Sequence, residues 1–228
     1  MKKTLITLAT AAAAVVAPGI AQAELSANMA LTSNYKFRGI DQSDNKPAIQ
    51  GGFDFESGGF YLGNWNSSIG FTGAGIEMDV YGGYAGEVAG VGYDVGILYY
   101  GYPGESSLAT TELYGGVTFG PVTVKYSHTV SSKWFGGERG RGNGYLQAGT
   151  DFELGGGLTL NAHVGYSRFT SKFKNLFDVP NYVDYLVGVT YDVGNGFEVA
   201  AAAVGATKRS FWGDDGKARL ILTLSKSL

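Results

Sequence analysis

The chain has 228 residues and a formal charge of −3, and it contains 37 glycines, 15 tyrosines, 13 phenylalanines and no cysteine. Glycine at about 16%, against a usual ~7%, disfavours an all-helical protein because each glycine costs roughly 1 kcal/mol inside a helix, and 14% aromatic residues disfavour disorder. The absence of cysteine excludes disulfides and thiolate metal sites, no cofactor is expected, and the charge gives no reason to expect a nucleic-acid partner.

The first 23 residues have the pattern of a secretory signal peptide. Lys2 and Lys3 precede an almost uninterrupted apolar run over 5–17, and Ala21-Gln22-Ala23 offers a small-x-small cleavage site. A helix of that run would reach only about 20 Å, against a hydrocarbon core of ~30 Å, so a membrane anchor is disfavoured. We therefore expect 1–23 to be cleaved on export and 24–228 to form one domain.

From Leu25 onward, apolar and polar residues alternate with the period of two that is typical of strands with unlike faces. In the first segment, one face carries Met29, Leu31, Tyr35 and Phe37, and the other face is mostly polar. Twelve such segments are predicted, at 26–39, 47–56, 60–71, 75–87, 91–102, 108–119, 121–131, 144–154, 158–169, 182–193, 197–206 and 218–227.

The connections between these segments alternate between tight turns and longer loops. The longer loops are predicted at 40–46, 72–74, 103–107, 132–143, 170–181 and 207–217. A soluble sandwich or lipocalin would also show alternating strands, but it gives no reason for turns of alternating length. A transmembrane barrel does, because it has short periplasmic turns, long outer loops and an even number of strands.

Aromatic residues gather at the short-turn ends of the segments, as in the interfacial girdle of a membrane barrel. They are Phe53, Phe55, Tyr61, Tyr84, Tyr93, Phe119, Phe152, Tyr191 and Phe197. Segments of this length can also cross an apolar band when tilted, whereas globular strands average five to six residues. We therefore predict an all-β fold, a transmembrane antiparallel up-and-down β-barrel of 12 strands over 24–228, in the outer membrane of a Gram-negative bacterium.

One stretch carries a family resemblance. It reads SNYKFRGIDQS at 33–43, PAIQGGFDF at 47–55 and GFYLGNW at 59–65. With the length and layout of the whole chain, this motif resembles the TorF family of proteobacterial outer-membrane proteins, which implies an exported porin but no particular solute. Two positions depart from the family: Asp41 stands where a small hydroxyl residue is expected, and the chain ends in Leu228 where such barrels commonly end in phenylalanine.

The face opposite the apolar one is strongly acidic. It carries Asp54, Glu56, Glu77, Asp79, Glu87, Asp94, Glu112, Asp151, Glu153, Asp184, Asp192 and Glu198, opposed by Lys36, Arg38, Lys125 and Arg219. The candidates for lining a pore are Lys36, Arg38, Asp79, Asp94, Glu112, Lys125, Asp184 and Arg219. A narrow channel preferring cations or neutral polar solutes is one interpretation, and a lumen closed by pairing of these bases with carboxylates is the other.

The three longest predicted loops are basic overall. Because guanidinium groups pair well with phosphate, Arg139 and Arg141 are candidates for contact with lipopolysaccharide headgroups, with ordinary loop solubility as the alternative. Outer-membrane lipid and lipopolysaccharide are the expected partners, together with the barrel assembly machinery acting through the C-terminal strand. The oligomeric state is not indicated.

An enzyme is a third interpretation, because outer-membrane phospholipases are also twelve-stranded barrels with a lipid-facing Ser-His pair. Only His128 and His163 could serve as the base, and no outward serine is expected near His128, since Ser127 and Ser131 point the other way. The prediction is therefore a non-enzymatic pore that passes small hydrophilic solutes with a mild cation preference. A non-conducting structural or surface-interaction barrel is the alternative, and a lipid-modifying enzyme a distant third.

Overall fold

The computed structural model describes residues 23–228 as a closed barrel of twelve antiparallel strands. The wall strands are β1 (Glu24–Thr32), β4 (Ala48–Ser57), β5 (Phe60–Ser68), β6 (Ile76–Val88), β7 (Val91–Gly101), β8 (Thr110–Phe119), β9 (Val122–Thr129), β12 (Gly144–Gly155), β13 (Leu158–Arg168), β14 (Tyr182–Gly194), β15 (Phe197–Ala206) and β16 (Arg219–Ser227). Neighbours in the chain are neighbours in the wall, and β1 pairs with β16 to close it. The predicted signal peptide lies outside the described residues, apart from Ala23.

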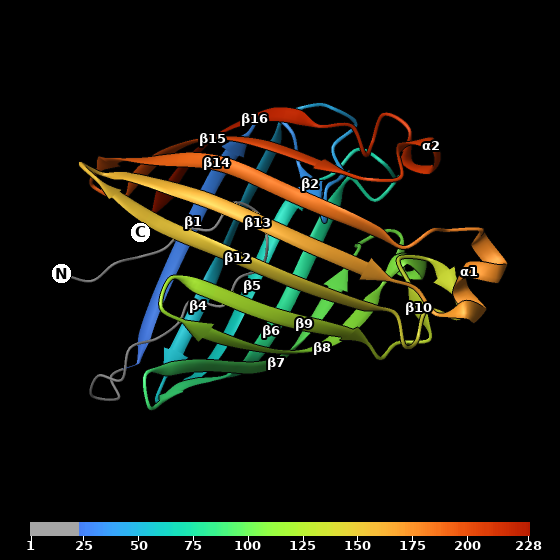
Figure 1. The fold of residues 1–228 in the computed structure, drawn as a ribbon, viewed down its shortest axis with the longest axis horizontal. Helices are drawn as coiled ribbons and strands as arrows, with labels where there is room; N and C mark the ends of the chain where they lie inside the picture. The colour runs from blue at the N-terminus through green and yellow to red at the C-terminus, as the bar shows by residue number, and fades with distance from the viewer. Residues whose placement is uncertain (1–22) are drawn as a thin grey trace.

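The two ends of the barrel differ (Figure 1). Five short turns and the C-terminus lie at one end, on the left of the view, and six longer connections lie at the other end. The longer connections hold the remaining elements: the small hairpins β2 (Lys36–Phe37) with β3 (Ile40–Asp41) and β10 (Lys133–Trp134) with β11 (Gly137–Glu138), a 3-10 turn at Ser106–Leu108, and the helices α1 (Ser171–Phe177) and α2 (Arg209–Trp212). This asymmetry confirms the alternation of turn lengths predicted from the sequence.

Along most of the wall the outward side chains are apolar and exposed, with Asn64 and Asn66 of β5 as polar exceptions, and the inward ones are mostly polar and buried. On β14, Tyr185, Val187 and Val189 are exposed outward, whereas Asp184 is 2% exposed. Eleven of the predicted segments agree with wall strands to within three residues at either end. A wall of this kind satisfies its backbone hydrogen bonds between strands and leaves no open edge.

The first predicted segment is wrong beyond Thr32. The wall strand β1 ends there, and residues 33–47 turn inward across the end of the barrel that carries the longer connections, which we call the outer mouth. There β2 and β3 form a small hairpin. Tyr35 and Phe37, which were expected on the outward face, instead pack inside the barrel, Tyr35 being 2% exposed. The alternation of polar and apolar residues therefore extends past the end of the wall strand through 33–37, and only Lys36–Phe37 of this stretch forms a strand.

Glycines of the wall make room for tyrosines inside it. A Cβ at Gly83 would lie 2.4 Å from the hydroxyl of Tyr61, and one at Gly96 would lie 2.4 Å from that of Tyr114. The rings therefore rest on the backbone of the neighbouring strand, a close approach that only glycine allows. Tyr61 was expected in the outer girdle but faces the lumen, where its hydroxyl contacts Asp94 and Tyr114 at 2.5 Å each. Phe60 takes the outward position beside Tyr84.

Two apolar clusters involve the inward hairpin. One lies inside the barrel around Tyr35, Tyr100 and Tyr102, with Phe37 and Phe135 packed against it. The other, which includes Phe169, Phe173, Val179 and Tyr182, joins the outer loops, with Ile40, Trp134 and Trp212 packed against it. The inward hairpin contributes to both clusters, through Phe37 and Ile40. Within residues 23–228, no helix has the length and apolar character needed to cross a bilayer.

Candidate functional site: the inward hairpin and the acidic lumen

The inward hairpin (residues 33–47) holds its shape through Asp41. The carboxylate of Asp41 is buried and accepts hydrogen bonds from the side chain of Asn34 and from the backbone N–H groups of Ser43, at 2.9 Å, and Asn45, at 3.1 Å. The single oxygen of a serine or threonine hydroxyl could not accept all three of these hydrogen bonds. The residue that departs from the TorF motif is thus the one that organises the turn here.

Arg38 ties the hairpin to the opposite wall. Its Nη1 and Nη2 donate to Oε1 and Oε2 of Glu112 on β8 at 3.2 and 2.6 Å, and both side chains are almost fully buried. The guanidinium also lies 4.1 Å from the ring centroid of Tyr145 on β12. Two parallel charge-assisted bonds and a cation–π contact fix the side chain in one orientation.

A second attachment runs through Glu77 on β6, which the alternation places on the inward face but does not single out as a candidate for lining a pore. Tyr35 of the hairpin donates to its Oε1 at 2.7 Å, and Tyr102 donates to its Oε2 at 2.5 Å. Asp79, two residues along the same face, is 3% exposed, and its Oδ1 has no hydrogen-bond partner among the described protein groups. The outer lumen therefore holds one tyrosine-bound carboxylate and a second that is only partly satisfied.

The tip of the hairpin rests against β14 and β15. Gly39 has φ +78°, and a Cβ there would lie 2.6 Å from the carbonyl oxygen of Gly205 and 2.7 Å from Cβ of Asp184. Asp184 in turn accepts a bond from the hydroxyl of Tyr145 at 2.9 Å and lies 3.0 Å from Nε2 of His163. His163 is therefore a lumenal polar residue, as predicted from its place in the alternation.

Lys36 anchors the other side of the hairpin to the β15–β16 loop. Its Nζ donates to the backbone carbonyls of Asp215 at 2.5 Å and of Gly39 at 3.3 Å. Burial, and then the nearby carboxylate of Asp41, raise the pKa of Asp215, and Lys36 opposes this only in part. Attachments to β6, β8, β14 and this loop together place the hairpin across the whole mouth.

The remaining candidates for pore lining occupy two different depths. Lys125 on β9 pairs with Asp94 on β7 at 3.3 Å and lies 3.7 Å from the ring centroid of Tyr114. Arg219 sits at the start of β16 and pairs with Asp214 of the outer loop at 3.0 Å. Arg38 and Lys125 thus pair with lumenal carboxylates, as the closed-lumen interpretation expects, whereas Lys36 bonds to carbonyls and Arg219 pairs with an exposed acid of the loop. Pore lining by these residues stays a prediction.

Arg139 and Arg141 lie at the surface in the β9–β12 loop, and neither faces the lumen. Arg141 donates from Nε to the carbonyl of Val130 at 2.9 Å, and Arg139 adopts a left-handed backbone with φ +63°. His128 faces outward, with Nδ1 3.2 Å from the hydroxyl of Tyr126. Its wall neighbours across the sheet are Leu113 and Gly144, so no serine stands opposite it.

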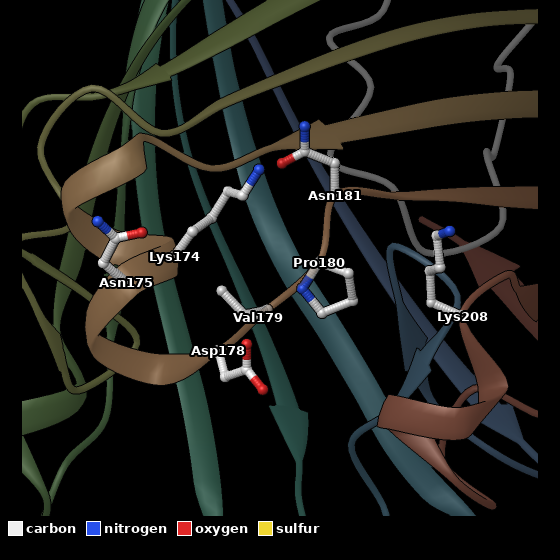
Figure 2. Close-up of a pocket in the computed structure, with 7 residues that line it drawn as sticks. All are labelled: Lys174, Asn175, Asp178, Val179, Pro180, Asn181 and Lys208. Carbon is white, nitrogen blue, oxygen red and sulfur yellow. The ribbon is translucent and has the colours of Figure 1, made fainter.

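An open pocket of about 380 Å³ lies among the outer loops, and Figure 2 shows it between the end of α1 and Lys208. We call it the rim pocket; its lining residues are Lys174, Asn175, Asp178, Val179, Pro180, Asn181 and Lys208. The basic character of the loops is visible in the sequence, but the sequence does not show that Lys174 and Lys208, which belong to different loops, share a pocket.

Comparison with known proteins agrees with the barrel fold. A solved structure titled KdgM porin superposes with a TM-score of 0.60 at 11% identity, covering 89% of this chain and 99% of that one. The same values hold for a structure of KdgM porin in complex with disordered oligogalacturonate. A structure of NanC porin gives 0.54 at 7% identity, covering 89% and 98%. At these identities the likeness concerns the fold alone.

A comparison with curated protein sequences gives no match. A model of one family, described as a bacterial protein of unknown function and named Gcw_chp, matches residues 17–226. That range includes every strand of the wall except the final residue of β16, together with the inward hairpin. The chain therefore belongs to the Gcw_chp family.

Proposed function

We propose that this chain is a non-enzymatic outer-membrane porin that passively passes small hydrophilic solutes, prefers cations, and is narrowed at its outer mouth by the inward hairpin. The observation that carries the proposal is the inner face of the closed wall, where more acids than bases are buried. The buried acids are Asp41, Glu77, Asp79, Glu112 and Asp184, and the buried bases are Lys36, Arg38 and Lys125.

Hydration of the lumen is supported by two incompletely bonded carboxylates. Asp79 Oδ1 and Asp184 Oδ2 are buried and have no partner among the described protein groups. Leaving a carboxylate oxygen unpaired in an apolar interior is costly, and the cost falls where water can reach the group. Both oxygens are shielded from solvent in this structure, so we propose that water reaches them when the side chains packed around them move.

The cation preference follows from the same charges. One similar structure is of a porin with oligogalacturonate, which is a polyanion. The surplus of carboxylates in this lumen would repel a polyanion, so neutral or cationic solutes are proposed for this chain. The resemblance of 33–65 to the TorF family agrees with an exported porin.

A non-conducting barrel is the second candidate, because the hairpin is held so firmly. Arg38, Tyr35 and Phe37 all make buried contacts across the mouth. In that case the hairpin would be a permanent closure and the protein a structural or surface-interaction barrel.

Single-channel recording in planar bilayers separates the two. We expect small conductance steps from the wild-type protein and larger ones when residues 34–46 are replaced by a short Gly-Ser linker. Conductance only from the linker variant would identify the hairpin as a closed gate. The porin proposal would be contradicted if neither the wild-type protein nor the linker variant showed conductance above background although both barrels were correctly folded.

Selectivity is tested by Asp79→Asn, which removes a buried lumenal charge that has no basic partner within ion-pair distance in the described chain. The reversal potential in a potassium chloride gradient should move toward the nonselective value. Glu138→Gln, an exposed acid on an outer loop, serves as the control and should leave the potential unchanged. Equal shifts in both variants would contradict a lumenal origin of the preference.

Contact of Arg139 and Arg141 with lipopolysaccharide phosphates is proposed on charge alone. Both side chains are on an exposed outer loop, which supports it, although Arg141 Nε is already bonded to Val130. Unchanged stability of the Arg139→Glu, Arg141→Glu variant in lipopolysaccharide-containing membranes would contradict this contact.

A further inference from the structure

We propose that the rim pocket binds the phosphate of an anionic glycolipid headgroup in the outer leaflet, with Lys174 and Lys208 as the residues that recognise it. The inference rests on the barrel lying in an outer membrane, as proposed above, and does not depend on whether the lumen conducts. It concerns a site distinct from Arg139 and Arg141, and it is built from two loops that meet above the outward face of β13, β14 and β15.

The pocket is held at the edge of the outward, lipid-facing wall. Asn181 donates from Nδ2 to the hydroxyl of Tyr166, an outward residue of β13, at 2.9 Å, and accepts at Oδ1 from the backbone of Phe169 at 2.9 Å. Val183 and Thr207 exchange two hydrogen bonds, one through the Thr207 hydroxyl at 2.9 Å and one between backbones at 2.8 Å. These bonds hold Thr207, and with it Lys208, close to Asn181 at the end of the wall that carries the longer connections.

The charge around the pocket complements an anion. Lys172 and Lys174 lie on α1, Lys208 and Arg209 lie at the start of α2, and all four are exposed. The one acid of the lining is Asp178, the left-handed C-cap of α1, and within the described chain it forms no ion pair with either pocket lysine. Figure 2 shows Lys174 and Lys208 on opposite sides of Asn181 and Pro180.

Lys208 is held in place by its backbone. It has φ +61°, a conformation that a lysine rarely adopts, and its carbonyl accepts hydrogen bonds from Phe211 at 2.9 Å and Trp212 at 3.1 Å. The turn is therefore maintained by the surrounding contacts, and backbone strain of this kind concentrates at sites where a side chain must be presented. Here the side chain presented is the second pocket lysine.

Apolar side chains are also exposed on the two helices whose residues form the pocket, although none of them lines it. Leu176 and Phe177 on α1 and Phe211 on α2 are each more than 40% exposed, and Tyr166 and Tyr185 face outward on the wall below. Soluble inorganic phosphate would leave this apolar surface exposed to water, whereas a membrane lipid would cover part of it while the phosphate of the lipid contacted the lysines. Charge and apolar exposure together therefore favour a membrane lipid over a soluble phosphate.

Native mass spectrometry of the detergent-solubilised protein tests the site with bisphosphorylated lipid A as the probe. We expect lipid A to bind about tenfold more tightly than enzymatically dephosphorylated lipid A, and the Lys174→Gln, Lys208→Gln variant to lose about tenfold in lipid A affinity. The matched control is Lys46→Gln, Lys133→Gln, which removes two outer-loop lysines already paired with Asp44 and Glu138. The control should bind like the wild type.

Three results would overturn the proposal. They are equal binding of the dephosphorylated lipid, an equal loss in the control variant, and displacement of lipid A by inorganic phosphate at concentrations comparable to the lipid. The shift of each variant between heated and unheated electrophoresis shows that its barrel is intact. Conductance recorded from the same preparations keeps a failure of the lipid site separate from a failure of the porin proposal.

Discussion

Arg38 forms the buried ion pair that fixes the inward hairpin to the wall, so its replacement should lower the free energy of unfolding. Arg38→Met leaves the carboxylate of Glu112 buried without its counter-ion, and breaking such a pair costs about 3–5 kcal/mol. We expect a loss of that order in the free energy of unfolding, measured by urea titration of tryptophan fluorescence in lipid vesicles. Glu112→Gln in the same chain should recover most of it by removing the uncompensated charge.

The control for Arg38 is a pair at the surface. Lys46 and Asp44 are joined at 2.7 Å, but both are largely exposed. Exposed pairs contribute little to stability, so Lys46→Met should leave the unfolding curve unchanged. A comparable loss in both variants would mean that the Arg38 pair is not the anchor that its burial indicates.

Single residues also show where sequence reasoning stops. The alternation placed Asp79, Glu112 and Asp184 on the inward face, and they lie there. It could not show that Arg38 would meet Glu112, because the two are 74 positions apart and a period of two carries no information on partners. The prediction for Tyr61 is wrong because β5 carries the polar Asn64 and Asn66 on its outward face, in phase with Phe60 and Leu62, so polarity indicates the wrong phase for this strand.

At the scale of elements, the wall follows from periodicity and the hairpin does not. Strand bounds could be predicted since each wall strand has one lipid face and one wet face, and turns interrupt the pattern. Residues 33–37 keep the same pattern although they leave the wall. Their direction is decided by long-range contacts with β6, β8 and β14, which a local pattern cannot represent.

The position of the hairpin can be tested at its tip. Gly39→Ala puts a Cβ against the carbonyl of Gly205 at 2.6 Å, where backbone on both sides must move. We expect the hairpin to shift from its seat and the single-channel conductance to rise.

The matched substitution is Gly104→Ala in the β7–β8 connection. Gly104 also has a positive φ, +91°, but the nearest atom to its Cβ would be 4.0 Å away. Gly104→Ala introduces the same kind of backbone strain as Gly39→Ala but no steric clash, so the conductance of this variant should equal that of the wild type. An unchanged conductance in Gly39→Ala would argue against the hairpin as the constriction.

The whole molecule presents an outward apolar surface whose sensitivity to charge should depend on depth. Val187 lies in the middle of β14 and Val193 near its short-turn end, and the two are similarly exposed at 57% and 58%. In a bilayer, Val187→Arg should cost about 2–4 kcal/mol and Val193→Arg about 0–1 kcal/mol. Equilibrium unfolding from lipid vesicles measures both, and equal costs would contradict insertion at the depth that the fold suggests.

The inward hairpin has a final consequence, for the order in which the molecule assembles. It follows directly after the first strand, yet Lys36 reaches a carbonyl 179 positions further along the chain, and Arg38 needs a wall that has already curled. Contacts so distant in sequence form slowly. We therefore expect the hairpin to dock late in folding, at about the time when β1 pairs with β16. The barrel would then pass through a short-lived intermediate in which the wall is closed but the hairpin does not yet cross the outer mouth.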